Sequence, residues 1–340
     1  MKSLRVLFLV LLLVNVFFVL PVTAKTFKIA TAAPEGSQWM KEMRSGAEKI
    51  KQRTEGRVKI KFYAGGVMGN DKSVMRKIRI GQLQGGAFVS GSLDEVDPDI
   101  SLFSLPMVFR SYEEVDYVRK AMDRELIDHL EQAGFACFGF AEGGFAYIMS
   151  PTPIRSIEDA RGLKIWVPEG DTISYRGMES IGLAPVVLPI TDVMTGLQAS
   201  LIEVVASSPI GALAFQWHTK VKYVTSTPLS YLYGTLVIDQ RHFKKLSAAD
   251  QKVVREVMEA IYADLDRSNR KENQEAVKAL TAQGIEFIDP PADETAKWRS
   301  ITADLNRQMG KEGLFSVGLY DKIVSTLEQF RAGKKDGTSH

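Results

Sequence analysis

Aromatic side chains near the predicted ends of strands are the residues of this chain whose chemistry best suits holding a small molecule. Each ring offers a broad apolar face, and Trp and Tyr add one polar group. Ligands of α/β proteins bind beyond the C-terminal ends of strands or between domains, so rings at such positions in both halves of the chain predict a cleft. Taken singly, each ring is also typical of a core position. The set consists of Trp39, Phe88, Phe145, Tyr147, Trp166 and Trp217.

Sequence motifs of catalysis and cofactor binding are absent. The sequence contains no G-x-S-x-G, G-x-G-x-x-G or G-x-x-x-x-G-K-[ST] pattern. Its four histidines show no metal-ligand spacing with cysteine or carboxylates. Cys137 is the only cysteine, which excludes an intrachain disulfide, and its apolar neighbours indicate a buried thiol. We therefore predict that the protein is not an enzyme and has no catalytic residue, cofactor or metal site.

The elements that must position the aromatic residues alternate between short strands and amphipathic helices. The first half predicts strands at 27–31, 58–62 and 87–89, with helices that start at Ser37 and at Asn70 or Asp71. Gly65 and Gly66 follow the second strand, which fits either a close backbone approach or a tight turn. Pro151 and Pro153 then break the chain, and a second α/β unit begins at 163–167. This order predicts an α/β fold with a largely parallel sheet and two domains.

A long helix is predicted after Ser247. Ser247 and Asp250 form an N-terminal cap, and neither Pro nor Gly occurs again before Gly284. Such a helix spans roughly 54 Å at 1.5 Å per residue. Its middle, 266–275, is strongly polar. A helix that crosses two domains and a helix bent within one domain both fit this pattern.

The N-terminus is typical of a secretory signal peptide. Lys2 and Arg5 precede an apolar run at 6–20, and small residues at positions 22 and 24 fit cleavage after Ala24. The run is short for a membrane span, although an uncleaved anchor is the alternative. The 43 basic residues nearly balance the 41 acidic ones, which gives no electrostatic reason to expect a nucleic-acid partner. We expect an exported protein of two ordinary domains.

Three segments of the second half carry a family resemblance. They are the strand 163–168 with sequence LKIWVP, the segment 191–198 with sequence TDVMTGLQ, and the run 221–225 with sequence VKYVT. Together they resemble the DctP-type solute-binding proteins of TRAP (tripartite ATP-independent periplasmic) transporters. The segments 29–33, 81–83 and 103–109 and the long helix also fit, so the resemblance covers nearly all of the mature chain.

The resemblance implies a two-lobe periplasmic binding protein fold, with a ligand cleft between the lobes and the long helix across both. Closure of the lobes would capture a small organic solute for membrane permease subunits driven by an ion gradient, and the protein would act as a monomer. A sensor subunit for a membrane histidine kinase is the main alternative, and an enzyme is a distant third. The implied division is a signal peptide at 1–24, lobe I at 25–150 and 236–276, lobe II at 151–235 and 277–331, and a disordered tail at 332–340.

The departures from the family pattern concern the ligand. The family arginine that pairs with a substrate carboxylate corresponds to Trp166 here, and a second family arginine corresponds to Ala146. An indole has one donor and no charge, so it cannot replace the two charge-assisted bonds of a guanidinium. We therefore expect a ligand other than a simple C4-dicarboxylate, larger or more apolar. Ser207 or Ser208 occupies the position of the usual Asn in the turn that closes the ligand site. Glu142, Glu169 and Asp171 leave open a cationic or polyhydroxylated ligand. The alternative is that these three acids are surface or helix-cap residues. The predicted ligand-binding residues are thus Trp39, Phe88, Glu142, Tyr147, Trp166, Glu169, Ser207, Ser208 and Trp217.

Overall fold

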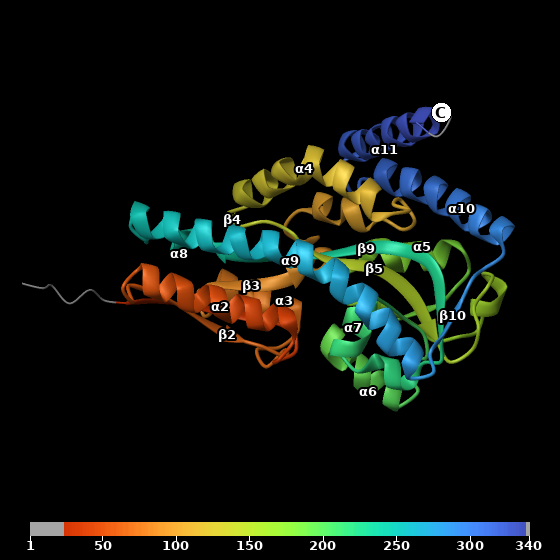
Figure 1. Cartoon of the computed structure of the whole chain (residues 1–340), viewed down its shortest axis with the longest axis horizontal. Helices are drawn as coiled ribbons and strands as arrows, with labels where there is room; N and C mark the ends of the chain where they lie inside the picture. The colour runs from red at the N-terminus through yellow and green to blue at the C-terminus, as the bar shows by residue number, and fades with distance from the viewer. Residues whose placement is uncertain (1–23, 338–340) are drawn as a thin grey trace, which may run out of the picture.

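The computed structural model describes residues 24–337, and their helices surround a large mixed sheet (Figure 1). The predicted signal peptide, except Ala24, and residues 338–340 lie outside this range. None of the described helices combines the length and apolar character needed to cross a membrane. The strands are β1 (Lys25–Thr31), β2 (Val58–Tyr63), β3 (Gly85–Val89), β4 (Phe135–Cys137), β5 (Ala141–Ser150), β6 (Ile165–Pro168), β7 (Pro185–Leu188), β8 (Val205–Ser207), β9 (Tyr223–Asp239) and β10 (Glu286–Ile288).

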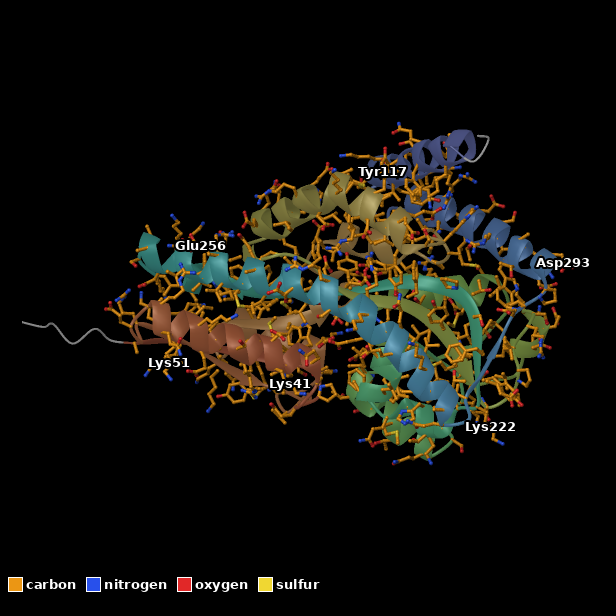
Figure 2. All side chains as sticks on the ribbon, viewed as in Figure 1. Lys41, Lys51, Tyr117, Lys222, Glu256 and Asp293 are labelled. Carbon is orange, nitrogen blue, oxygen red and sulfur yellow. The ribbon has the colours of Figure 1, made fainter. Side chains whose placement is uncertain are left out.

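The helices cover both faces of this sheet, and side chains fill the space between them (Figure 2). The α-helices are α2 (Gln38–Arg53), α3 (Asp71–Arg79), α4 (Tyr112–Gln132), α5 (Thr172–Ser180), α6 (Val193–Gln198), α7 (Pro209–Ala214), α8 (Gln240–Phe243), α9 (Ala248–Ala282), α10 (Ala292–Lys311) and α11 (Val317–Gly337). Short 3-10 turns are η1 (Ser90–Leu93), η2 (Pro98–Ser104), η3 (Glu158–Ala160), η4 (Ile190–Asp192) and η5 (Trp217–Lys220).

Two lobes share this sheet. In lobe I, β2, β1 and β3 pair in parallel in that order, as the alternating sequence pattern predicts. Ser37 and Asn70 cap α2 and α3 by accepting hydrogen bonds from the backbone N–H groups of Met40 and Ser73. In lobe II, β6 and β7 form a separate two-stranded parallel sheet, and the backbone N–H of Trp166 donates to the carbonyl of Val204 at 2.9 Å beside β8.

The strands β5 and β9 join the lobes. They pair with each other in antiparallel fashion along most of their length. The C-terminal end of β9 pairs with β3 of lobe I, and its N-terminal end pairs with β10. The sheet is therefore mixed rather than largely parallel, because one 17-residue strand runs through both lobes.

Helix α9 spans both lobes, which confirms one of the two structures that the sequence allowed. It packs against α2 of lobe I, crosses β5, and reaches α7 of lobe II (Figure 1). Ser247 caps it by accepting a hydrogen bond from the Asp250 N–H at 3.1 Å. Its polar middle stays helical because Asn269 and Asn273 are buried and hydrogen-bonded to β5.

The C-terminal helices return toward lobe I. Helix α11 lies beside α4 (Figure 1), and Tyr320, Ile323 and Leu327 share one apolar core with Val115 and Val118. The proposed lobe boundaries remain a prediction, and this packing attaches the end of the segment 277–331 to elements assigned to lobe I. Helix α11 continues to Gly337, past the start of the predicted disordered tail at 332.

Candidate functional site

A cavity of about 740 Å³ lies between the two lobes. Lobe I contributes residues of β1, α2, α3 and β3 to its wall, and lobe II contributes residues of β6, β8, α5 and α7. All four tryptophans of the chain, which are Trp39, Trp166, Trp217 and Trp298, line it. Cavities of this size that are mostly apolar with a few polar groups are typical of small-molecule sites.

The structure places eight of the nine predicted ligand-binding residues on the wall of this cavity. They are Trp39, Phe88, Glu142, Trp166, Glu169, Ser207, Ser208 and Trp217. Tyr147 does not line it. Its half-buried ring packs against two apolar cores, because it lies on β5 where the lobes join.

Trp166 and Trp217 form an aromatic wall in lobe II. Their rings meet edge to face with centroids 5.1 Å apart, and Phe215 stacks on Trp217 at 5.1 Å. The single donor of Trp166, Nε1, donates to the carbonyl of Leu188 at 2.9 Å. Trp166 therefore offers the cavity apolar surface and no free polar group.

The two serines of the closing turn lie at the end of β8. Ser208 caps α7, with its Oγ accepting a hydrogen bond from the Gly211 N–H at 3.3 Å. Ser207 pairs in register with Tyr147 of β5. The turn thus points the start of α7 toward the cavity, which Ile210 and Gly211 also line.

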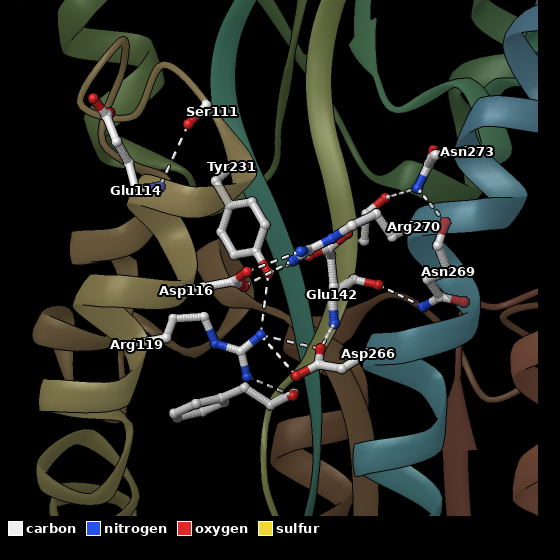
Figure 3. A network of polar contacts seen from close by, with 12 residues as sticks. Ser111, Glu114, Asp116, Arg119, Glu142, Tyr231, Asp266, Asn269, Arg270 and Asn273 are labelled. Carbon is white, nitrogen blue, oxygen red and sulfur yellow. Dashed lines mark hydrogen bonds and ion pairs between the residues drawn. The ribbon is translucent and has the colours of Figure 1, made fainter. Parts of the chain in front are cut away.

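Glu142 lines the cavity and also has a partner within the protein. Its side chain is fully buried and forms an ion pair with Arg270 of α9, with Nη2 and Oε2 2.6 Å apart. The hydroxyl of Tyr231 donates to the same oxygen at 3.3 Å. Burial raises the pKa of Glu142, while Arg270 opposes the rise. The carboxylate of Glu142 is therefore engaged with the protein (Figure 3).

The contacts around Glu142 extend into a polar network that ties four elements together (Figure 3). Arg119 of α4 pairs with Asp266 of α9 at 2.9 Å and donates to the carbonyl of Phe140 at 2.9 Å. Asp266 accepts a hydrogen bond from the Glu142 N–H at 2.6 Å. Because α4, β5, β9 and α9 all contribute, the network fixes α9 where it crosses between the lobes.

Carboxyl groups gather where the two lobes meet. Asn70 of lobe I donates to Glu169 Oε2 of lobe II at 2.5 Å. Ser92 donates to Asp71, and Asp171 accepts a hydrogen bond from the Ser174 N–H at the start of α5. Burial raises the pKa of both Asp71 and Asp171.

Asp94 extends this acidic region within lobe I. Burial raises its pKa to about 8, and the nearby charge of Asp171 adds to the rise. Ser101 donates a hydrogen bond to its carboxyl group. Asp71 lines the cavity although no sequence pattern marks it as a cavity residue, whereas Asp94 does not line the cavity.

Among the described residues, one group has the spacing of metal ligands, and it lies outside the cavity wall. It consists of Asp97, Asp99 and His129. Each carboxylate already has a structural partner: Asp97 accepts from the Asp99 N–H at 2.9 Å, and Asp99 accepts from the Ser316 N–H at 2.6 Å. His129 Nδ1 lies 3.0 Å from Asp97. Sequence reasoning missed this group because His129 lies far from the two acids along the chain.

Helix α10 supplies a wall that sequence reasoning also missed. Four of its residues line the cavity at the spacing of one helical face. Their helical spacing could have been recognised in the sequence, but such spacing does not show which part of the protein the helix face contacts. They are Trp298, Ile301, Thr302 and Leu305.

An α/β fold of two lobes around a lined cavity, crossed by one long helix, is the fold of periplasmic solute-binding proteins. Residues 29–312 match the DctP family model, described as bacterial extracellular solute-binding protein, family 7. The chain therefore belongs to this family, which confirms the resemblance of the sequence motifs. Its members are solute-binding receptors rather than enzymes.

Relatives and solved structures agree with this assignment. The chain is 24% identical over 268 residues to the C4-dicarboxylate-binding periplasmic protein DctP of Rhodobacter capsulatus, covering 76% of this chain and 78% of the relative. Its fold matches the galactonate complex of a sugar acid binding protein from Advenella mimigardefordensis with a TM-score of 0.83, at 17% identity, covering 90% and 98% of the two chains. It also matches a succinate-bound TRAP solute-binding protein of Sulfurospirillum deleyianum with a TM-score of 0.80, at 18% identity, covering 88% and 97%.

Proposed function

We propose that this protein captures a small organic solute between its lobes and delivers it to the membrane subunits of a TRAP transporter. The observation that carries the proposal is the cavity of about 740 Å³ whose wall comes from both lobes. Contacts between the lobes at the cavity wall, such as the Asn70–Glu169 hydrogen bond, support closure of the lobes around the solute. As the resemblance to TRAP solute-binding proteins implies, an ion gradient at the permease would drive the transport.

Transport tests this proposal directly. A solute that co-purifies with the protein is identified by mass spectrometry, and its uptake is followed in membrane vesicles that contain TRAP permease subunits, with and without the purified protein. We expect uptake only when the protein, the permease and an ion gradient are all present. Uptake that is independent of the protein would contradict the proposal.

We further propose that the protein is exported to the periplasm as a monomer after cleavage behind Ala24. The apolar run at 6–20 and the small residues at 22 and 24 support this. The intact mass of the protein recovered from the periplasm tests the cleavage, and light scattering tests the monomer. A mature chain that retains residues 1–24 would contradict it.

The solute is proposed to differ from a simple C4-dicarboxylate. Trp166 replaces the carboxylate-binding arginine, and its only donor is already bonded to Leu188. No Arg, Lys or His of the described residues lines the cavity. The succinate-bound neighbour therefore shares the fold without defining this ligand.

Thermal unfolding in the presence of succinate and malate tests this part. A bound ligand raises the melting temperature by mass action. Because no Arg, Lys or His of the described residues lines the cavity, we expect neither compound to raise it. A shift with succinate or malate that persists in Trp166→Ala would contradict the proposed role of the indole.

A further inference from the structure

Arginine side chains gather where three helices meet. Helix α11 packs against both α4 and α10 (Figure 1). Arg110 precedes α4, Arg299 lies on α10 and Arg331 lies on α11. None of the three arginines lines the cavity between the lobes. The helix junction is therefore a separate place in the fold from the proposed solute site.

Backbone carbonyls of the segment before α4 hold this helix junction together. Arg331 Nη2 donates to the carbonyl of Val108 at 3.1 Å, and Asn306 of α10 donates to the carbonyl of Pro106 at 3.2 Å. Arg299 lies seven residues before Asn306, so the two residues share one face of α10. The face of α10 that carries Arg299 is therefore the face that packs against the segment before α4.

The buried carboxylate at the helix junction is already bound. Glu114 accepts hydrogen bonds from Arg331 on both of its oxygens, at 2.8 and 2.9 Å. The backbone N–H of Arg110 donates to the same carboxylate at 2.8 Å. Glu114 thus balances the charge of Arg331 and has no oxygen left for a second guanidinium.

The other two arginines of the helix junction have no partner in the protein. The side chains of Arg110 and Arg299 make no hydrogen bond or ion pair with any residue that the structure describes. Glu113, the neighbouring acid in the first turn of α4, is exposed. Its pKa is lowered by a hydrogen bond with Ser111 and by the charge of Lys334. The junction therefore carries two guanidinium charges that the described residues do not balance.

Arg299 is the less favourable of these two charges because it is partly buried, whereas Arg110 is exposed. Burial lowers the pKa of Arg299, and the charges of Arg110 and Arg331 lower it further against the opposing charge of Glu114. A desolvated cation beside like charges is unfavourable, and a bound anion offsets that cost. Arg299 Nη1 is enclosed and has no hydrogen-bond partner, so an anion would bind the other two nitrogens.

We propose that the helix junction binds a small oxyanion with two negative charges, such as sulfate or hydrogen phosphate, between Arg110 and Arg299. The two unbalanced guanidinium charges match a dianion, and the planar fork of a guanidinium forms charge-assisted bonds with such oxygens. Bound there, the anion links α10 to the start of α4. Helix α10 also carries Trp298 on the cavity wall, so the anion stabilises a helix that encloses the solute site.

Inorganic sulfate tests the site, since it stays a dianion near neutral pH. Melting temperatures of the full chain are measured in millimolar sodium sulfate and in sodium chloride of the same ionic strength. Binding to the folded state stabilises by mass action, so sulfate at about 100 times its Kd should raise the melting temperature by about 4 °C relative to chloride. Equal melting temperatures in the two salts would overturn the inference.

Neutral variants locate the anion. Arg110→Gln and Arg299→Gln should each remove most of the rise with sulfate, because each removes one of the two cations. Arg299→Gln should also melt at a higher temperature than the wild type in chloride, because it removes a partly buried charge without a partner. Arg307→Gln is the matched control on α10 and should keep the full rise, because Arg307 is 58% exposed and pairs with Asp304.

Titration calorimetry with sulfate provides a second measurement. Arg110 is exposed, so Arg110→Gln should fold normally and should bind sulfate at least tenfold more weakly than the wild type. A rise in melting temperature that persists in both Arg110→Gln and Arg299→Gln would show a general salt effect and would overturn the inference. Solute capture is independent of these results, because none of these arginines lines the cavity.

Discussion

Gly66 and Thr191 meet across the two lobes, and the contact leaves no space for a side chain at position 66. Gly66 follows β2 in lobe I, and Thr191 lies between β7 and α6 in lobe II. A Cβ atom at position 66 would lie 2.3 Å from Thr191 Cγ2, well inside van der Waals contact. Gly66 also has a φ of 70°, so the tight turn and the close approach that the sequence left as alternatives are both present.

Gly66→Ala should therefore hinder closure of the lobes. The added methyl group clashes with Thr191, and overpacking of this kind costs about 1–3 kcal/mol. We expect solute affinity to fall about fivefold or more. Titration of the co-purified solute, followed by tryptophan fluorescence, measures the change.

Gly65→Ala is the matched control. It has a φ of 64°, so it carries the same backbone strain, but no atom lies within 4 Å of its missing Cβ. Thr191→Ser removes Cγ2 and should restore affinity to the Gly66→Ala variant. Equal losses in Gly65→Ala and Gly66→Ala would show that backbone strain, rather than the interlobe contact, is responsible.

Arg270→Gln should lower the stability of the protein strongly. It leaves the fully buried carboxylate of Glu142 without its cation, and breaking a buried pair costs about 3–5 kcal/mol. Urea unfolding measures the loss. Arg267→Gln is the control on the same helix, because Arg267 is 72% exposed and its pair with Asp264 contributes about 0–1 kcal/mol.

A second substitution tests the cause of the Arg270 effect. Adding Glu142→Gln to Arg270→Gln removes the unpaired charge and should recover much of the lost stability. If the double variant is as unstable as the sum of the two single variants, the pair is not coupled and this account of the network is wrong.

Asn273→Ala should loosen the attachment of α9 to lobe II. Asn273 accepts a hydrogen bond from the Ile210 N–H of α7 at 3.2 Å and donates to the carbonyl of Gly143 at 3.3 Å. Leaving these buried backbone groups unpaired costs about 1–3 kcal/mol. Urea unfolding should show this loss, whereas Gln274→Ala, an exposed neighbour, should change stability by about 0.5 kcal/mol or less. Equal effects of the two variants would contradict the role of Asn273.

Stability without ligand should fall as the pH rises toward 8. The pKa of Asp94 is raised from 3.8 to about 8, so the folded state binds more protons than the unfolded state between these values. Asp71 and Asp171, whose pKa values are also raised, act in the same direction. Melting temperatures measured across this pH range should decline in the wild type.

Asp94→Asn should flatten this decline, because the amide keeps the hydrogen bond from Ser101 but cannot ionise. Glu95→Gln, at an exposed neighbouring position, should leave the decline unchanged. A pH profile that is the same in Asp94→Asn and the wild type would show that Asp94 does not titrate in this range.

The sequence alone determined the parts of this protein that depend on local chemistry. The caps at Ser37 and Ser247 set the starts of two helices, because a side-chain oxygen meets free N–H groups within one turn. For α3 the sequence allowed Asn70 or Asp71, and the structure has Asn70 as the cap. Residue type and spacing also marked the family motifs and most of the aromatic wall. Eight of the nine predicted residues line the cavity for this reason: strand ends and turns are visible in the sequence, and the cleft lies at strand ends.

Only the tertiary structure decided the features that depend on partners far apart along the chain. Glu142 reads as a candidate ligand-binding acid until Arg270, 128 residues away, is seen to pair with it. Contacts with the other lobe also determine the surroundings of several residues, and the sequence does not show these contacts. Examples are the cavity-lining face of α10, the acids Asp71 and Asp94, and the space beside Gly66. The sign of the charge in the cavity is likewise a property of the folded chain, because folding decides which carboxyl groups line the cavity and which receive a cationic partner.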